Sequence, residues 1–319
     1  MEKKFETLLK IKYGSLDPKV NLEPDFFTGF DPARRKEIVT EEAAFYHGIT
    51  QPYSKDDKLE KHYESFTAED GYEIPVKIYR PKNATGSLPV VMFFHGGGFM
   101  TCSVETHDYV PSYLAAEAGV IAINVEYRLA PEYKFPRGLE DCYLACKWAI
   151  EHKEKLGIAE DRLFVCGDSS GGNFAAAIAL MAKDRKEFDV YGQILIYPVT
   201  DVAEVVKKRS LEVYGSVCGT EEHPTPVLTS YFKNIKADAG KPYASPLLAD
   251  DLEGLPKALF IQAECDGLVD DGLMYAKRLK DAGVPVECKV YEGMPHAFIL
   301  RTYSETFEAL DQICAFLKK

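Results

Sequence analysis

Strand-like and helix-like segments alternate from about residue 73 to the C-terminus, and this alternation constrains the fold more than any other feature. Several of the strand candidates are short, continuous apolar runs bounded by glycine, proline or charge, as expected of strands covered on both faces. The candidates are Ile74–Tyr79, Val90–Phe94, Val120–Val125, Leu163–Cys166, Gln193–Tyr197, Leu259–Ala263 and Val286–Tyr291. The helical patterns are Leu139–Lys155, Gly172–Lys186, Asp270–Ala282 and Glu305–Lys318. This order predicts an α/β fold, with a mostly parallel central sheet and helices on both faces.

Two segments fall outside this alternation. Residues 1–55 look helical and charged, with Phe5, Leu8 and Leu9 on a helical spacing. Residues 201–240 interrupt the alternation and contain no convincing strand. A helical insertion of that length in a compact α/β domain commonly covers a functional site.

Composition excludes several classes of function. The 319 residues carry a net charge of −12, which argues against a nucleic-acid partner. The longest apolar stretch, Leu88–Phe94, is far shorter than the ~18 residues that a membrane span needs. The N-terminus has no signal-peptide core, and the eight cysteines form no CxxC pair. We expect a cytoplasmic protein with reduced thiols, no membrane span and no metal.

A sharp strand-to-helix turn is predicted at Gly167-Asp168-Ser169-Ser170-Gly171-Gly172, which contains the pattern G-x-S-x-G. Between a strand and an alanine-rich helix, this pattern forms a nucleophile elbow. Glycine is needed at Gly167 and Gly171 because the backbones approach closely on either side of the serine. The turn would leave Ser169 strained and exposed as a nucleophile. The helix that follows would offer N–H groups to a developing oxyanion.

A run of three glycines follows the strand candidate Val90–Phe94, in His95-Gly96-Gly97-Gly98-Phe99. Without side chains, such a backbone can approach a substrate and direct several N–H groups at one point. This run is the esterase form of an oxyanion hole. We predict that the donors are the N–H groups of Gly97, Gly98 and Ser170, with Gly96 shaping the loop. His95 is a candidate base, but a hydrogen-bonding support for the loop is the better interpretation.

A serine nucleophile also needs a base and an acid that orients the base. In α/β-hydrolases these follow in the chain order Ser, Asp, His, on loops after late strands. Only His296 among the seven histidines lies in such a loop near the C-terminus. We therefore predict that His296 is the base for Ser169.

The loop after Leu259–Ala263 offers four acids. Glu264 directly follows the strand, too early to reach the histidine loop. Asp270 and Asp271 open a helical pattern, where a carboxylate can cap the helix. Asp266 lies between strand and helix, and we assign it as the orienting acid.

These residues resemble one family, the hormone-sensitive-lipase-like esterases, the bacterial group within the α/β-hydrolases. HGGGF at 95–99 and GDSSGG at 167–172 are similar to its two signatures. Further similar segments are Tyr127–Glu132, Ser245–Leu247 and the Asp-x-Leu-x-Asp pattern from Asp266 to Asp270. The resemblance runs from about residue 70 to the C-terminus. It implies hydrolysis of short- to medium-chain carboxylic esters through an acyl-enzyme on Ser169, without metal or cofactor.

The resemblance also implies a domain plan. Residues 56–200 and 241–319 would form the catalytic domain, with 1–55 as N-terminal cap helices and 201–240 as a cap insertion. Members of the family often dimerise along the last strand, so a homodimer is expected. The chain departs from the family at Ser170, where alanine is usual, and at Gly267, where proline is usual. Only the backbone of Ser170 is needed, whereas Gly267 is expected to loosen the loop that carries Asp266.

Two other functions are compatible with this fold. A catalytically inactive relative that only binds a small ligand should have lost a triad member, but this chain keeps Ser169, Asp266 and His296. A peptidase or amidase is the second alternative, since the glycine run favours ester substrates by family analogy only. Parallel assays of an aryl ester and its anilide would separate an esterase from an amidase.

Overall fold

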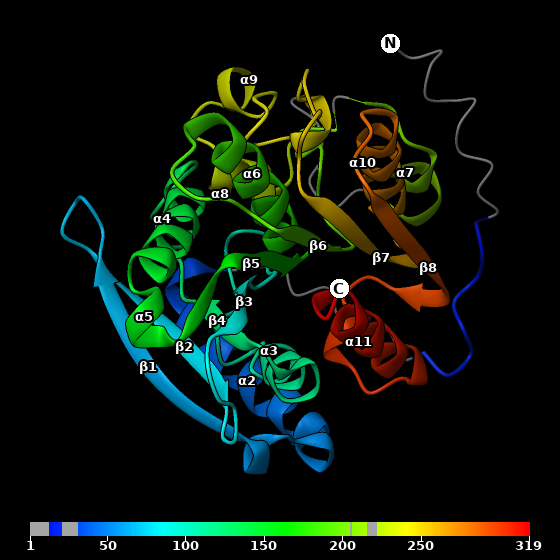
Figure 1. Cartoon of the computed structure of the whole chain (residues 1–319). Coiled ribbons are helices and arrows are strands. Elements are labelled where there is room, and N and C mark those ends of the chain that lie inside the picture. Colours follow the sequence, from blue (N-terminus) through cyan, green and yellow to red (C-terminus); the bar gives the residue numbers. More distant parts are fainter. Residues whose placement is uncertain (1–12, 21–30, 205, 216–221) are drawn as a thin grey trace.

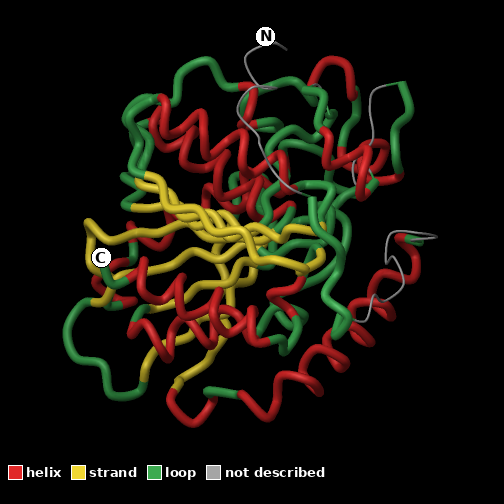
Figure 2. The backbone as a smooth tube through the Cα atoms, turned by 90° about the vertical axis from the view of Figure 1, so that its right-hand side faces the viewer, coloured by secondary structure: helices red, strands yellow, loops and turns green. Residues whose placement is uncertain are grey.

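The computed structural model describes residues 13–20, 31–204, 206–215 and 222–319. An eight-stranded sheet crosses the molecule, with helices on both of its faces (Figure 1, Figure 2). Its order is β1-β2-β4-β3-β5-β6-β7-β8. The bounds are β1 Leu59–Thr67, β2 Glu73–Pro81, β3 Leu88–Phe94, β4 Ile121–Val125, β5 Ile158–Asp168, β6 Gly192–Ile196, β7 Lys257–Cys265 and β8 Val286–Pro295. Strands β3 to β8 are parallel, and β2 is antiparallel to both β1 and β4. The predicted α/β fold is confirmed.

All seven predicted strands form, and β1 is the strand that the sequence did not predict. It is an edge strand whose residues are mostly exposed or half-buried. Hydrogen bonds to β2 pair it over its full length, from Leu59 opposite Pro81 to Thr67 opposite Glu73. A strand that is held by backbone pairing and buries few side chains shows no apolar run, so its sequence resembles a loop.

Helices cover the two faces of the sheet in separate groups. The bounds are α2 Arg35–Thr50, α3 Tyr109–Leu114, α4 Arg137–Glu151, α5 Lys153–Leu156, α6 Ser170–Arg185, α7 Arg209–Tyr214, α8 Pro226–Tyr231, α9 Ile235–Asp238, α10 Val269–Asp281 and α11 Ser304–Leu317. Buried residues of α4, α6 and α10 share one core, and those of α2, α3 and α11 share the other. The four predicted helices are present, although the first divides into α4 and α5. The short α3 was not predicted.

The middle strands supply both cores. On β3, Val90, Met92 and Phe94 belong to one core, whereas Val91 and Phe93 belong to the other. Successive side chains of a strand point to opposite faces, so a strand covered on both sides must be apolar throughout. This explains why continuous apolar runs predicted the inner strands correctly.

The two segments outside the alternation contain helices among their described residues. In the described part of residues 1–55, α2 is the main helix and residues 13–20 form no helix, while Phe5, Leu8 and Leu9 lie outside the described residues. The insertion contributes α7, α8 and α9, and its described residues form no strand. Residues of α8 pack into the same core as α4 and α6. No helix formed by the described residues combines the length and apolar character that a membrane crossing requires.

Candidate active site

Ser169 lies at the junction of β5 and α6, in a backbone conformation that non-glycine residues rarely adopt. Its φ is 54° and its ψ is −119°. Its N–H donates to the carbonyl oxygen of Ile196 on β6 at 2.9 Å, and its own carbonyl accepts from the N–H of Val199 at 3.2 Å. Such a conformation costs on the order of 1–3 kcal/mol and persists only where the surroundings fix it. Bonds to the neighbouring strand and its loop do so here.

The two glycines of the elbow have no room for a side chain. A Cβ atom on Gly167 would lie 2.3 Å from the carbonyl oxygen of Gly171. A Cβ atom on Gly171 would lie 1.9 Å from the carbonyl oxygen of Phe94. Because the obstacles are backbone atoms that cannot rotate away, β3, β5 and α6 meet this closely only with glycine at both positions.

Ser169, His296 and Asp266 come together from three different loops. The Nε2 atom of His296 lies 2.9 Å from Ser169 Oγ, and its Nδ1 atom lies 2.7 Å from Asp266 Oδ2. The other carboxylate oxygen of Asp266 accepts the N–H of Leu268 at 2.8 Å. With Nδ1 donating to Asp266, the neutral imidazole presents an unprotonated Nε2 to the serine hydroxyl.

The charge of Asp266 sets the basicity of His296. Burial lowers the pKa of His296, but the attraction and hydrogen bond of Asp266 raise it, with a further contribution from Asp168. The net effect is a pKa above the usual histidine value. The carboxylate therefore stabilises the imidazolium that forms when the histidine accepts a proton.

The remaining acids of this loop have other partners. Glu264 is the second last residue of β7 and accepts the N–H of Gly293 at 2.8 Å. The expectation that it is too early to reach the histidine loop is therefore wrong, but the group that it binds there is a backbone N–H. Asp270 accepts the N–H of Ser210 at 2.9 Å, and Asp271 accepts the N–H of Thr200 at 3.0 Å. Asp270 and Asp271 do lie in the first turn of α10, but their carboxylates bind backbone groups of other segments. The expectation that they cap this helix by accepting its N–H groups is therefore wrong, whereas their place in its first turn, where they favour the helix dipole, is as expected.

The glycine loop presents backbone N–H groups beside the elbow. Gly97 and Gly98 have φ values of 117° and 59°. A Cβ atom on Gly97 would lie 2.3 Å from the carbonyl oxygen of Thr101. Within the described residues, no hydrogen bond occupies the N–H groups of Gly97 and Gly98. Ser170 is the first residue of α6, where helical geometry leaves the N–H without an intrahelical acceptor.

His95 is fully buried beneath this loop. Its Nδ1 atom lies 2.7 Å from the carbonyl oxygen of Gly96, and its ring stacks on Tyr127 at 4.3 Å between centroids. The hydroxyl of Tyr127 donates to the carbonyl oxygen of His95 at 2.7 Å. Burial lowers the pKa of His95 to about 3, with a smaller effect from His107. A buried neutral ring packed in this way supports the loop.

A second histidine and aspartate meet next to the nucleophile, and the sequence did not predict this pair. The Nε2 atom of His107 lies 3.3 Å from Asp168, and both side chains are buried. Asp168 also accepts the N–H of Gly96 at 2.9 Å, so it joins the elbow to the glycine loop. The hydroxyl of Thr106 lies 2.8 Å from Nδ1 of His107. The available signal was that Asp168 is the polar residue directly before the serine, within an otherwise apolar strand end.

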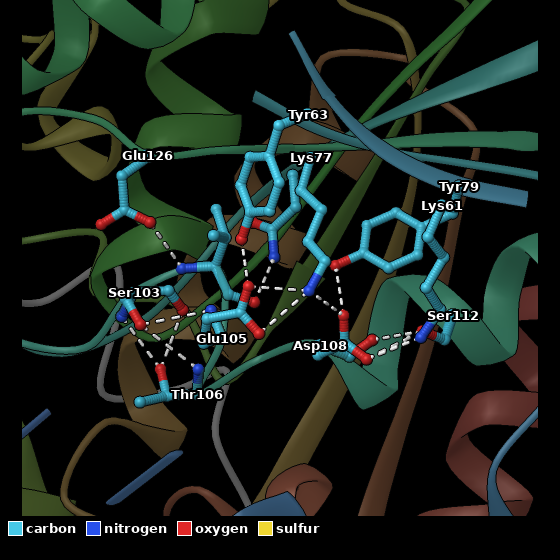
Figure 3. Close-up of polar contacts among 12 residues, drawn as sticks. Lys61, Tyr63, Lys77, Tyr79, Ser103, Glu105, Thr106, Asp108, Ser112 and Glu126 are labelled. Carbon is cyan, nitrogen blue, oxygen red and sulfur yellow. Dashed lines mark hydrogen bonds and ion pairs between the residues drawn. The ribbon is translucent and has the colours of Figure 1, made fainter. Parts of the chain in front are cut away.

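Charged side chains join the loop that carries His107 to β1 and β2 (Figure 3). Lys77 on β2 lies 2.8 Å from both Glu105 and Asp108. Lys61 on β1 lies 2.8 Å from Asp108 as well. These contacts flank His107 on both sides in the chain. The unpredicted strand β1 thus contributes to holding the second histidine beside the elbow.

The assembled groups suit acyl transfer. They comprise a serine hydroxyl, a histidine that presents an unprotonated ring nitrogen to it, a carboxylate that orients the histidine, and unoccupied backbone donors. Together these groups can move a proton and hold an oxyanion. In the described part of the chain, no three His, Cys, Asp or Glu side chains gather closely enough to hold a metal ion.

Known proteins are similar in sequence to this chain over most of its length. A family model described as the α/β-hydrolase fold matches residues 91–300. An ethyl acetate hydrolase of Pseudomonas putida is 37% identical over 238 residues, which cover 74% of this chain and 74% of that protein. An arylesterase of Saccharolobus solfataricus is 36% identical over 230 residues, which cover 72% of this chain and 74% of that protein.

Solved structures agree with the sequence relatives. An esterase of Pyrobaculum calidifontis has a TM-score of 0.81 and 37% identity, and the match covers 91% of this chain and 94% of the other. A thermostable carboxylesterase from a metagenomic library has a TM-score of 0.82 and 34% identity, covering 91% and 98%. The likeness in fold thus extends well beyond the residues that the family model matches.

Proposed function

The chain belongs to the α/β-hydrolase fold family, within its hormone-sensitive-lipase-like esterases, and on that premise we propose that it cleaves short- to medium-chain carboxylic esters through an acyl-enzyme on Ser169. The relatives named above are esterases or ester hydrolases, and the protein is a carboxylic ester hydrolase. The proposal adds the nucleophile, the other groups of the site and the size of the substrate.

In the proposed reaction, Ser169 Oγ attacks the ester carbonyl carbon while His296 Nε2 accepts the hydroxyl proton. Asp266 keeps the imidazole in the required tautomer and stabilises its positive charge. The N–H groups of Gly97, Gly98 and Ser170 hold the oxyanion. His296 then protonates the departing alcohol, and a water molecule that gives its proton to His296 hydrolyses the acyl-enzyme.

One observation carries this proposal: the continuous chain of contacts from Ser169 Oγ through His296 to Asp266, at 2.9 and 2.7 Å. Asp270 is the alternative acid, but it is engaged by the N–H of Ser210 and by the hydroxyl of Tyr13 at 2.9 Å. Asp266 is therefore the acid that we propose.

The proposed substrate size rests on how the insertion covers the site. Ser169 is only 7% exposed. Tyr231 of α8 stacks flat on Phe99 of the glycine loop, with 3.8 Å between ring centroids. An enzyme that docks on lipid droplets should instead present a broad apolar surface. We propose residues 1–55 and 201–240 as the cap over a catalytic domain of residues 56–200 and 241–319, with small-molecule esters as substrates.

The nucleophile is tested with Ser169→Ala and a series of p-nitrophenyl esters. We expect wild-type rates to be highest for acyl chains of about two to eight carbons. The variant should lose the activity and also the covalent labelling by a fluorophosphonate that wild type shows. A variant that keeps its rate, or a wild type that prefers emulsified long-chain triglyceride, would contradict the proposal. Comparing an aryl ester with its anilide tests the amidase alternative.

We further propose that two copies pair along β8. This strand is an edge of the sheet, and Glu287, Cys288 and Lys289 on it are exposed. An edge strand offers unpaired backbone groups to another strand. Light scattering at micromolar protein should give the mass of a dimer, and a monomer mass would contradict the pairing.

A further inference from the structure

Gly267 directly follows the proposed triad acid, at a position where its backbone is tightly covered. A Cβ atom on Gly267 would lie 2.2 Å from the carbonyl oxygen of Gly215, the residue that ends α7. Glycine next to Asp266 gives the loop more backbone freedom than proline would. It also lets the backbone of the insertion approach the loop closely. Some other feature must then keep the loop in one conformation.

Ser210 on α7 provides two bonds to this loop. Its hydroxyl donates to the carbonyl oxygen of Gly267 at 2.6 Å. Its backbone N–H donates to Asp270 Oδ2 at 2.9 Å. Ser210 is fully buried, so water does not compete for these bonds. One residue of the insertion thus binds the backbone just before Leu268 and a side chain two residues after it.

Lys208, just before α7, anchors the helix against the catalytic domain. Its ammonium lies 3.1 Å from Asp201 and 3.0 Å from Asp271, with no exposed side-chain surface. A buried charge is tolerated only where opposite charges surround it, and removing a partner is costly. Asp271 also accepts the N–H of Thr200 at 3.0 Å. These contacts hold α7 firmly beside the start of α10.

The same backbone orients Asp266. One carboxylate oxygen of Asp266 accepts the N–H of Leu268 at 2.8 Å, while the other lies 2.7 Å from His296. The carbonyl of Asp266 accepts the N–H of Val269 at 3.1 Å. The direction of the carboxylate therefore depends on the path of the chain through Gly267 and Leu268.

We propose that α7 positions the triad acid: Ser210, anchored through Lys208, holds the Gly267 loop so that Asp266 stays aligned with His296. This inference rests on the proposed role of Asp266. The insertion then has a second task besides covering the substrate, because it sets the strength of the base. Ser210 is a positioning residue, since it reaches the chemistry only through Asp266.

The test is Ser210→Ala, with kcat measured per serine titrated by a fluorophosphonate. We expect kcat to fall by about 10- to 100-fold with KM little changed, because misplacement of a catalytic group costs rate more than binding. The acid limb of kcat/KM should move to lower pH, because a displaced Asp266 raises the pKa of His296 less. A role in folding alone would lower the melting temperature but leave this limb in place.

Tyr143→Phe is the control. Tyr143 on α4 is also buried, and its hydroxyl donates to the carboxylate of Glu187 at 2.9 Å. The variant loses a hydroxyl hydrogen bond that involves neither the acid loop nor the loop of His107. We expect kcat and the acid limb of this variant to match wild type. An equal loss in both variants would overturn the inference.

Gly267→Ala gives a second route if Ser210→Ala folds poorly, because the added methyl pushes the insertion away while Ser210 is kept. It should reproduce the fall in kcat and the shift of the limb. In an Asp266→Asn background, neither change should reduce kcat further, because the acid that they position is already lost. Additive losses, or wild-type behaviour of both variants, would overturn the inference. A Ser169→Ala enzyme that stays active would instead overturn the proposed function.

Discussion

Two histidine–aspartate pairs flank Ser169, and they differ in the partner of the ring nitrogen that does not face the aspartate. In the first pair, His296 uses Nδ1 for Asp266 and presents Nε2 to the serine at 2.9 Å. In the second pair, His107 uses Nε2 for Asp168, and its Nδ1 lies 2.8 Å from the hydroxyl of Thr106. The His296 side chain is 28% exposed, whereas that of His107 is 1% exposed.

Residue type and proximity to the serine are therefore not enough to make a histidine a base. A base must present an unprotonated nitrogen to the nucleophile, the role that we propose for His296. In the second pair, neither ring nitrogen of His107 faces the serine. The carboxylate of Asp168 is joined to the glycine loop through the N–H of Gly96. We therefore regard Asp168 as a brace between the elbow and the oxyanion donors, and His107 as its buried partner.

The largest expected effect comes from the same substitution in each histidine. His296→Gln should lower kcat by about four to six orders of magnitude, because no group remains to accept the serine proton. In His107→Gln the amide N–H can still donate to Asp168, so kcat should remain within about 100-fold of wild type. Steady-state rates on a p-nitrophenyl ester measure both. Comparable losses in the two variants would remove the distinction between the pairs.

The first pair follows from the sequence and the second does not, for physical reasons. Asp266 and His296 follow β7 and β8, two neighbouring parallel strands, so their carboxyl ends bring the two loops together. His107 lies in a loop without a regular pattern, and its partner Asp168 is hidden at the end of an apolar strand. The contacts that hold this loop come from Lys61 and Lys77 on β1 and β2, across long separations in the chain.

The fold, like the site, has parts that the sequence predicts and parts that it does not. The inner strands, such as β3, were predicted because burial on both faces requires an apolar run, whereas the polar edge strand β1 was not. The anchoring of α7 could not be predicted from the sequence either. Lys208 looks like a surface charge beside Lys207 and Arg209, and only the three-dimensional arrangement brings Asp201 and Asp271 around it.

The two aspartates allow the second comparison. Asp266→Asn should lower kcat by about 10⁴-fold, because an amide favours the wrong tautomer of His296. Asp168→Asn still offers an oxygen to the N–H of Gly96, so a weaker effect of about 10- to 100-fold is expected, arising from a less rigid oxyanion hole. Single-turnover measurements of acylation check both. If Asp168→Asn proves the more damaging change, the second pair takes part in proton transfer and the brace interpretation is wrong.

The smallest effect is on the pH dependence, and it separates the contributions of the two carboxylates to one pKa. His296 acts as a base only when neutral, so kcat/KM is lost as the pH falls through its pKa. Burial lowers that pKa and Asp266 raises it, followed by Asp168, to give a value above the usual one. The acid limb should therefore lie above the ~6.5 of an ordinary histidine. Tyr197, whose ring centroid is 4.8 Å from that of His296, stays neutral in this range because burial raises the pKa of its hydroxyl well above the usual value.

In Asp266→Asn the residual activity should show the acid limb at a clearly lower pH, because the effect of burial on the pKa of His296 then dominates. In Asp168→Asn the shift should have the same direction but a smaller size. Rates of wild type that stay constant down to about pH 4 would show that His296 is not the base.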